Sequence, residues 1–311
     1  MADQANILSE AQKGRPRAPA DSTAPVTVII PVCNRPELLK ESLSSVIQGT
    51  LWPAEILVIG NGHPEEIQND KNSFNQWKAE VSLSIQNQPS AARKYSAMKI
   101  SFLVCKRIGP AAARNLGARE ASQPYVAFLD SDDLWKSHKL ARQISFLEKR
   151  PHLKACHNLE DWIKHGKSLN VPLRLRPVTG RPLLESMEIC LISASSLLIE
   201  RSHFLEMDGF DERFLSCEDY EFWIRHFLSH TMGCLQEPLV IKRSGLWKQV
   251  SGSGLLDLQR LRALLVLRKP LIDRGLKEEL WNVARKKAGI LLQRNDSIAR
   301  HAARLLRAIE S

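Results

Sequence analysis

Three carboxylates lie within four residues, directly after an apolar run. The run covers residues 125–129, and the acids are Asp130, Asp132 and Asp133. Carboxylates this close repel one another and lose hydration unless a positive charge lies between them. Mg²⁺ or Mn²⁺ would supply that charge, since both prefer hard oxygen ligands and leave positions for substrate phosphates. The structural alternative is a helix N-cap, in which Asp132 or Asp133 caps a helix that begins near Leu134.

A second acidic pair stands farther along the chain, at Glu218 and Asp219, before the segment YEFWIRH. Acidic side chains in the first turn of a helix interact favourably with the helix dipole. Taken alone, the pair therefore indicates an ordinary helix start.

The elements before the acidic cluster predict a nucleotide-binding α/β sheet. Residues 26–32 form a short β-branched run typical of a strand buried on both faces, and residues 55–59 form a second one. Between them, Pro36 opens a helical pattern that ends at Gly49. A strand, a helix and a strand at this spacing predict a right-handed parallel crossover. Ligands bind at the carboxyl ends of such strands, which is where the acidic cluster lies.

The elements after the second strand have less regular sequence patterns. Residues 81–85 and 100–105 could each supply the third strand, and we favour the second, with the stretch between them as an insertion. An Ala-rich helix over 109–120 carries small residues that allow close packing on a sheet, and residues 134–149 form an amphipathic helix. The sequence also predicts a strand at 195–199, a helix after Asp219 and helices from Leu255 to the end.

Length and composition indicate a globular protein of 311 residues with 43% hydrophobic and 25% charged residues. We expect a disordered tail at 1–24, a main domain at 25–240 and a basic helical extension at 241–311. No secretory signal and no run of about 18 apolar residues stands out, so we expect a cytoplasmic protein. The six cysteines are spaced singly, which favours reduced thiols over a disulfide frame or a zinc site.

The net charge of +10 is concentrated in the last quarter of the chain. Residues 239–311 hold 16 Lys and Arg against 6 Asp and Glu. A solvated helix face is the favoured interpretation, because the basic residues alternate with leucines at helical spacing. The alternative is attraction to an anionic acceptor or to the inner face of an anionic membrane. No aromatic residues punctuate a basic stripe, so nucleic acid is not an expected partner.

Four segments in order resemble glycosyltransferase family 2. They are VTVIIPVCNRPELL, GPAAARNLG, YVAFLDSDD, and SASSLLIERSHFLEMDGFDERF followed by CEDYEFWIRH. They span roughly residues 25–230, and four ordered motifs are far more specific than any one of them. The resemblance implies the GT-A fold, a Rossmann-like α/β architecture with a mixed, mainly parallel sheet flanked by helices, here with a helical C-terminal extension.

The same resemblance implies an inverting transfer of a hexosyl group from a nucleoside diphosphate sugar, assisted by Mn²⁺ or Mg²⁺, in the synthesis of a bacterial-type surface polysaccharide or another glycan. Asp132 matches the main metal ligand, and Asp130 matches the acid near the ribose, which is a second candidate for the metal. Asp219 matches the general base, with Glu218 next to it in the catalytic pair. The acceptor is a glycan, a lipid-linked glycan or a protein. The other positions matched to donor contacts are Pro31, Arg35, Arg114 and Asn115.

Two departures from the family pattern leave a second function open. Gly60 and Asn61 stand where a pair of acids is usual; an asparagine amide can hydrogen-bond a nucleotide base but carries no charge. Leu246 and Lys248 stand where a histidine and an acid are common, and Lys248 could contact the diphosphate. The alternative is therefore a catalytically inactive relative that binds a nucleotide or a protein. A nucleotidyltransferase is disfavoured, because a Gly-rich triphosphate loop is missing.

Overall fold

The computed structural model describes residues 23–172, 179–245, 255–294 and 296–311. Most of the predicted N-terminal tail, together with Leu246 and Lys248, lies outside these residues. Predictions that concern those positions are therefore not tested by the structure.

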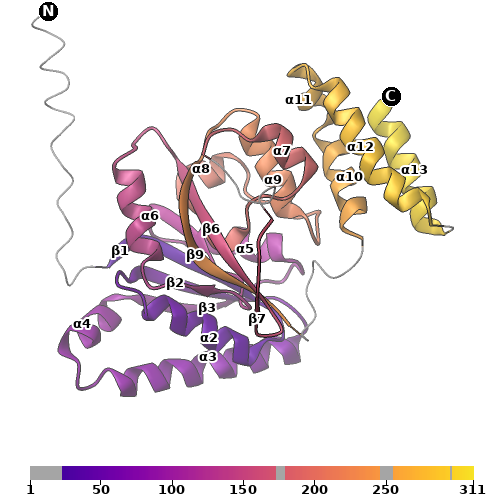
Figure 1. Ribbon diagram of the computed structural model, residues 1–311. Coiled ribbons are helices and arrows are strands. Elements are labelled where there is room, and N and C mark those ends of the chain that lie inside the picture. Colours follow the sequence, from indigo (N-terminus) through magenta and orange to yellow (C-terminus); the bar gives the residue numbers. More distant parts are fainter. Residues whose placement is uncertain (1–22, 173–178, 246–254, 295) are drawn as a thin grey trace, which may run out of the picture.

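One mixed sheet forms the centre of the described structure (Figure 1). Its strands follow the order β3-β2-β1-β4-β8-β6-β9-β5, with β7 paired to β6. Neighbours from β3 to β4 are parallel, β8 is antiparallel to both of its neighbours, and β6 is parallel to β9. The strands are β1 (Ala24–Val32), β2 (Pro53–Gly60), β3 (Lys99–Val104), β4 (Tyr125–Phe128), β5 (Leu134–Trp135), β6 (Ala155–Lys164), β7 (Lys167–Leu169), β8 (Leu198–Glu200) and β9 (Gly233–Ser244).

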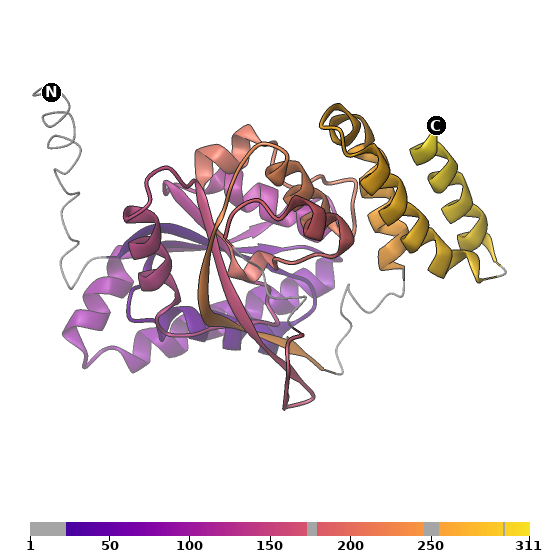
Figure 2. The same ribbon diagram turned by 45° about the horizontal axis from the view of Figure 1, so that its top comes forward.

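Helices cover both faces of this sheet, which explains why the strands are apolar without alternation (Figure 2). In β1, Val28 and Ile30 face one core and Ile29 faces the other. The first core is closed by α2 (Pro36–Ile47), α3 (Pro64–Ser84), α4 (Pro89–Ala97) and α6 (Lys139–Glu148). The second is closed by α5 (Pro110–Glu120), α7 (Leu183–Glu188), α8 (Arg201–Glu206), α9 (Glu218–Phe227) and the C-terminal helices.

The small residues of α5 bring this helix close to the sheet, as predicted. A Cβ atom on Gly117 would lie 2.4 Å from Cγ2 of Ile29 in β1, well inside contact distance. Only glycine therefore permits this approach. The close packing fixes the position of Arg114, one turn earlier in the same helix.

Several predicted elements are confirmed and others are wrong. The third strand is β3, as favoured, and residues 81–85 belong to α3 instead. The stretch between the two runs, interpreted as an insertion, contains the short helix α4, and the long helix α3 precedes it. The helix predicted from Leu134 begins only at Lys139, because Leu134 and Trp135 pair with β9 as β5. Its N-cap is His138, so neither Asp132 nor Asp133 caps it.

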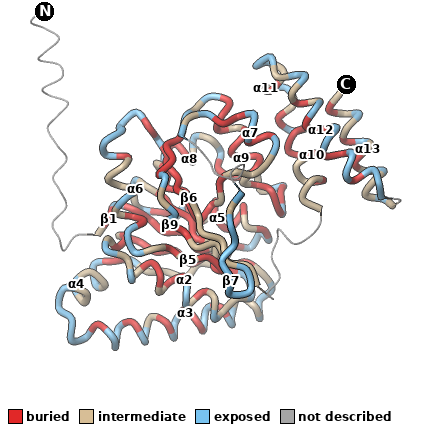
Figure 3. The backbone as a smooth tube through the Cα atoms, viewed as in Figure 1, coloured by how far each residue is buried: buried red, intermediate tan, exposed pale blue. Residues whose placement is uncertain are grey.

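The C-terminal helices pack on the rest of the protein (Figure 3). β9 continues to Ser244, so the predicted boundary at 240 falls inside a strand. Leucines of the extension, such as Leu261, Leu280 and Leu305, are buried in the same core as α9, as the favoured interpretation requires. Across the described ranges, no helix combines the length and apolar character needed to span a membrane. The helices are α10 (Leu256–Val266), α11 (Arg268–Asp273), α12 (Lys277–Leu292) and α13 (Ser297–Glu310).

Lys139 is a buried lysine, and it gives the stability of the protein a specific pH dependence. Its amine donates to Oε1 of Gln143 at 2.7 Å and lies over the Trp135 ring. Burial lowers the pKa of Lys139 to about 7 from 10.5. Between these values the unfolded chain binds more protons than the native protein, so stability rises as pH rises through this window.

The variant Lys139→Met should lack this dependence. At pH 7 we expect the variant to unfold at a higher temperature than wild type. The difference in the free energy of unfolding between the two proteins should shrink by about 1.4 kcal/mol per pH unit as pH rises towards 10. Thermal unfolding of both proteins over pH 6–10 measures it. Lys136→Met, at a partly exposed lysine paired with Asp161, is the matched control. Parallel pH profiles for wild type and Lys139→Met would contradict the assignment.

Candidate active site

A buried arginine joins the two acidic segments. Arg114, on α5, donates through one nitrogen to Oδ1 of Asp130 at 2.5 Å and through another to Oε1 of Glu218 at 2.6 Å. Its side chain is 6% exposed. Asp130 follows β4 and Glu218 begins α9, so one guanidinium brings together residues that are far apart in the sequence. The structure thus places both predicted acidic motifs in one site.

One guanidinium cannot neutralise two carboxylates, and the pKa values of the buried Glu218 and the partly exposed Asp130 shift in opposite directions. Burial raises the pKa of Glu218 despite the charge of Arg114, and Asp219 raises it further. Burial also works to raise the pKa of Asp130, but the charges of Arg114, Lys242 and Arg35 hold it below its usual value. Asp130 is therefore the ionised member, suited to hold a cation.

Asp132 has a different cationic partner. Its Oδ2 lies 3.0 Å from a guanidinium nitrogen of Arg35, in the loop after β1. That loop is held by the buried carboxylate of Asp70 on α3, which accepts the backbone N–H groups of Asn34 and Arg35 at 2.8 Å each. The β1–α2 loop thus places Arg35, a predicted donor contact, directly against the predicted metal ligand.

Asp133 is fully engaged in holding the site together. Its Oδ2 accepts from the hydroxyl of Ser195 at 2.7 Å, and its Oδ1 accepts from the backbone N–H of Arg243 at 3.0 Å. The amine of Lys242 lies 3.9 Å away. The same Ser195 hydroxyl accepts the backbone N–H of Asp130 at 3.1 Å. Asp133 therefore ties β4 to β9 and is not a candidate metal ligand.

The three acids of the cluster also have basic partners within the chain. Each acid has its own basic neighbour, and the described residues bring no three carboxylate oxygens of this cluster together as ligands. Asp130 and Asp132 nonetheless fit a divalent ion. Mg²⁺ or Mn²⁺ typically takes one or two carboxylates beside substrate phosphates.

Asp219 lies at the edge of this group and is partly exposed. One oxygen accepts the backbone N–H of the next residue, Tyr220, at 2.8 Å, which orients the carboxylate at the start of α9. The residue before the pair, Cys217, has a left-handed backbone with φ 63°. This sharp entry into α9 turns Glu218 to Arg114 and leaves Asp219 more accessible than its neighbour.

Lys242 and Ser195 are site residues that the sequence analysis missed. Lys242, near the end of β9, is 38% exposed on its side chain. Burial works to lower its pKa, but the charges of Asp133, Glu160, Asp130 and Asp219 raise it instead, so it stays a cation. The sequence did hold a signal for Lys242: Lys242 and Arg243 follow the apolar run of β9, as the acids follow the apolar run of β4.

Two of the predicted donor contacts are not brought to the carboxylates. Asn61 donates to the carbonyl of Arg107 at 2.7 Å and accepts the N–H of Gly109 at 2.8 Å. Asn115 likewise donates to the carbonyl of Phe210 at 2.7 Å and accepts its N–H at 2.9 Å. Both amides hold loops in place, and their roles as donor contacts stay predictions. Pro31, at the end of β1, is partly buried beside the Arg35 loop.

The departure at Gly60 has a steric cause. A Cβ atom on Gly60 would lie 2.7 Å from the ring of Phe102 on β3. An acidic side chain therefore does not fit there while Phe102 keeps its position.

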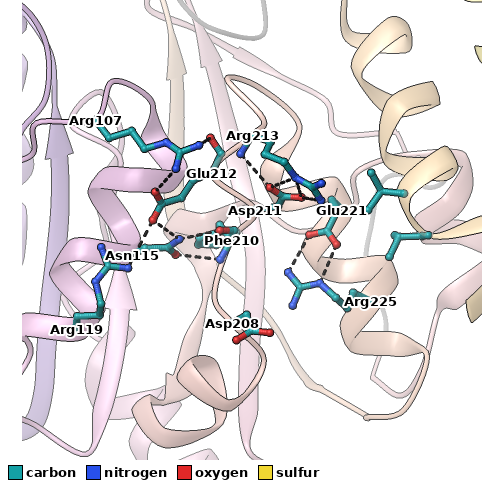
Figure 4. A pocket seen from close by; sticks show the side chains of 12 residues that line it. Arg107, Asn115, Arg119, Asp208, Phe210, Asp211, Glu212, Arg213, Glu221 and Arg225 are labelled. Atoms are coloured by element: carbon teal, nitrogen blue, oxygen red, sulfur yellow. Dashed lines mark hydrogen bonds and ion pairs between the residues drawn. The ribbon is translucent and has the colours of Figure 1, made fainter.

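A separate cavity of about 580 Å³ is lined by residues of α5, of α9 and of the segment 208–213 (Figure 4). Its four arginines are paired: Arg107 and Arg119 with Glu212, Arg213 with Asp211, and Arg225 with Glu221. None of the clustered carboxylates lines it. The candidate site is the carboxyl end of β4, around Asp130 and Asp132.

A mixed, mainly parallel sheet flanked by helices, with acids after its fourth strand and a second acidic pair at a helix start, defines an α/β architecture of the GT-A type. The family described as "Glycosyl transferase family 2" matches residues 27–185. This match covers half of the chain, and the chain belongs to that family.

Curated relatives carry glycosyltransferase names. A Rickettsia bellii protein named "Uncharacterized glycosyltransferase" is 29% identical over 216 residues, which are 70% of this chain and 28% of that protein. The chain likewise spans about a third of two further Rickettsia relatives. The amylovoran biosynthesis glycosyltransferase AmsB of Erwinia amylovora is 27% identical over 64% of this chain and 62% of its own length. WfgD of Escherichia coli, named as a UDP-Glc:alpha-D-GlcNAc-diphosphoundecaprenol beta-1,3-glucosyltransferase, is 26% identical over 64% of this chain and 68% of its own length.

Solved structures show the same fold at low sequence identity. TarS residues 1–349 of S. aureus, in complex with UDP-GlcNAc, match with a TM-score of 0.67 and 14% identity over 91% of this chain and 81% of that one. The mannosyltransferase PcManGT of Pyrobaculum calidifontis, in complex with GDP-Man and Mn²⁺, matches with a TM-score of 0.56 and 16% identity over 97% and 80% of the two chains. The predicted GT-A fold is confirmed.

Proposed function

We propose that this protein transfers a sugar from a nucleoside diphosphate sugar to an acceptor hydroxyl, with inversion at the anomeric carbon. The observation that carries the proposal is the Arg114 bridge: Arg114 pairs with Asp130 and also with Glu218, 104 residues further along the chain than Arg114, and so unites the two acidic motifs. Family membership and the glycosyltransferase names of the relatives support sugar transfer.

In the proposed reaction the acceptor oxygen attacks the anomeric carbon from the face opposite the diphosphate. The bond from that carbon to the diphosphate oxygen breaks, and its electron pair stays on the diphosphate. Asp219 accepts the proton of the acceptor hydroxyl. Arg35 and Lys242 supply positive charge on the donor side, where negative charge grows as the bond breaks.

Asp132 and Asp130 would hold the divalent ion, Mn²⁺ or Mg²⁺. When bound, this ion stabilises the leaving diphosphate as a Lewis acid. The Mn²⁺ named with the structurally similar PcManGT supports this choice. Arg35, which pairs with Asp132, must share or release that carboxylate when the ion binds.

Suitable donors to test follow from the relatives and structural neighbours. UDP-glucose, UDP-GlcNAc and GDP-mannose appear in their names and complexes, so these three form the donor panel. The name of WfgD makes a diphosphoundecaprenol-linked sugar the first acceptor to try. Contact of the basic C-terminal helices with an anionic membrane, and a cytoplasmic location, stay predictions.

Asp219→Asn tests the general base. We expect kcat to fall about 10²- to 10⁴-fold with little change in the KM for the donor, because the amide cannot accept the proton. Steady-state transfer assays with the donor panel measure this. Glu218→Gln separates the two acids: Glu218 pairs with buried Arg114, so its substitution should lower the unfolding temperature, whereas Asp219→Asn should not. A kcat within twofold of wild type for Asp219→Asn would exclude the role.

A catalytically inactive nucleotide-binding protein is the second candidate. It is favoured by Gly60, where Phe102 leaves no room for the usual acid, and by the basic partners already present at each carboxylate. This candidate predicts calorimetric binding of uridine diphosphate or guanosine diphosphate without turnover of any donor in the panel. Donor turnover that depends on Asp219 decides for the enzyme.

A further inference from the structure

Three histidines meet at a place that the proposed transfer reaction does not use. They are His203 on α8, His226 near the end of α9, and His230 in the turn that follows. One nitrogen from each ring lies within 4.8 Å of one nitrogen from each of the others. The ring centroids of His203 and His230 are 4.6 Å apart. The cluster lies at the opposite end of α9 from Glu218 and Asp219.

Local helix geometry explains how two of these rings come to share a face. His226 and His230 are four residues apart, and the N–H of His230 donates to the carbonyl of His226 at 2.9 Å, so the helical turn continues past α9. Side chains at this spacing lie one above the other. Two histidines at i and i+4 on a helix form a common zinc-binding pair. α8 then presents His203 from the neighbouring element.

The burial of these rings leaves polar atoms without partners. His226 is fully buried and His203 is 5% exposed. Nε2 of His203, Nδ1 of His230 and both ring nitrogens of His226 make no hydrogen bond to any described residue. Buried side-chain nitrogens are nearly always satisfied, so four in one cluster point to a missing partner.

The charge state of the cluster suits a metal. Burial, together with the neighbouring histidines, lowers the pKa of His226 to about 3, and a weak interaction with the Thr231 backbone works in the opposite direction. Burial and His230 also lower the pKa of His203. Burial therefore disfavours the charged form of His203 and His226, and the neutral imidazole is the form that binds a metal. Around His203, Glu200 and Glu206 bring negative charge and Lys154 positive charge, and Arg225 brings positive charge to His226.

We propose that His203, His226 and His230 bind one Zn²⁺ ion. Three imidazole nitrogens favour zinc over Mg²⁺ or Mn²⁺, which prefer oxygen ligands. Tetrahedral zinc with bonds of about 2.0–2.1 Å needs its nitrogens about 3.3 Å apart, so small side-chain rotations must close the present spacing. His230 is half-buried, which leaves one side open for a water as fourth ligand.

Such an ion would fasten α8 to the end of α9. The same two segments are already joined by Arg225 on α9, which donates to the carbonyls of Met207 and Gly209 just after α8. Because α9 carries Glu218 and Asp219 at its other end, the ion would brace the helix that presents them without touching the reacting atoms. The inference does not depend on the proposed transfer reaction.

The test uses the full chain without an affinity tag, stripped with a chelator and then loaded with Zn²⁺ in excess Mg²⁺. The Mg²⁺ occupies carboxylate sites such as Asp132 but competes poorly for imidazole. After gel filtration we expect about one zinc per chain, and a thermal midpoint several degrees above that of the stripped protein. Co²⁺ in place of Zn²⁺ should give the strong visible absorption of a tetrahedral site.

Variants assign the ligands. His230→Gln, at the half-buried position, should weaken zinc binding at least 100-fold and leave the unfolding of the stripped protein close to wild type. His203→Gln should lose zinc as well, and His230→Cys should restore binding, since a thiolate is also a zinc ligand. His152→Gln, at an exposed histidine, and Asp132→Asn are the controls that should keep the ion.

Two results would overturn the proposal. One is a wild-type protein that retains no zinc after loading at micromolar concentration, which would leave the rings as a core cluster satisfied in another way. The other is equal zinc retention by wild type and His230→Gln, which would place the ion elsewhere.

Discussion

Replacing Asp132 by asparagine should lower donor turnover about 10²- to 10³-fold, the size of effect seen when one group that stabilises developing charge is removed. The substitution keeps the shape of the side chain but removes the charge that faces Arg35 and would hold the ion. Turnover of the donor panel, measured over a range of Mn²⁺ concentrations, gives the result. We also expect the Mn²⁺ concentration for half-maximal rate to rise.

The matched control is Asp161→Asn. Asp161, on β6, is an exposed carboxylate that pairs with Lys136. Exposed ion pairs contribute about 0–1 kcal/mol, so activity and metal dependence should stay near wild type. Full activity of Asp132→Asn with an unchanged Mn²⁺ dependence would show that this carboxylate does not hold the ion.

Replacing Arg114 by methionine should destabilise the protein strongly. The variant leaves Asp130 and Glu218 without the guanidinium that pairs both, and removal of one partner of a buried ion pair typically costs about 3–5 kcal/mol. For a chain of this size the unfolding temperature should fall by about 6–12 °C. Thermal unfolding followed by circular dichroism measures the change.

The pH dependence distinguishes lost charge pairing from lost packing. In Arg114→Met the two carboxylates should have raised pKa values, so the native variant binds more protons than the unfolded chain above about pH 4. Its stability should therefore fall as pH rises from about 4 to 7, and the gap to wild type should widen. Arg119→Met, on the same helix but with an exposed side chain near Glu212, should cost at most about 1 kcal/mol at any pH. A pH-independent loss for Arg114→Met would contradict the account.

Most of the sheet could be predicted because its signals are local. The strands before and after α2, and the strand that ends at the acids, are short apolar runs bounded by turn residues. α3 was missed because its buried residues, Phe74, Trp77 and Val81, are few among many polar ones. The start of α6 was misplaced because Leu134 and Trp135 pair with β9, a partner about 105 residues away that local patterns do not reveal.

The chemistry of the site could be predicted better than its geometry. Family resemblance selected Asp130, Asp132 and Asp219 as candidates. In the structure, Asp130 and Asp132 lie after β4, and Asp219 lies next to Glu218, which Arg114 joins to Asp130. Their partners depend on tertiary contacts: Arg114 meets Glu218 across 104 residues, and Arg243 meets Asp133 across 110. Asn61 and Asn115 carry the right groups for a ligand, but both are used by nearby loops. Residue type alone cannot show that a side chain already makes its hydrogen bonds within the protein.

The tie between Asp133 and β9 also sets an order of events during synthesis. The backbone N–H of Arg243 and the amine of Lys242 reach Asp133 from about 110 residues later in the chain. At about 5–20 residues per second, the ribosome needs roughly 5–20 s to make that stretch. During this time the strands β1 to β4 can pair, yet Asp133 lacks its partners from β9. The nascent protein therefore pairs β9 with β5 and β6, and gives Asp133 its partners, only after β9 has emerged. A chain that stops before β9 cannot assemble the site.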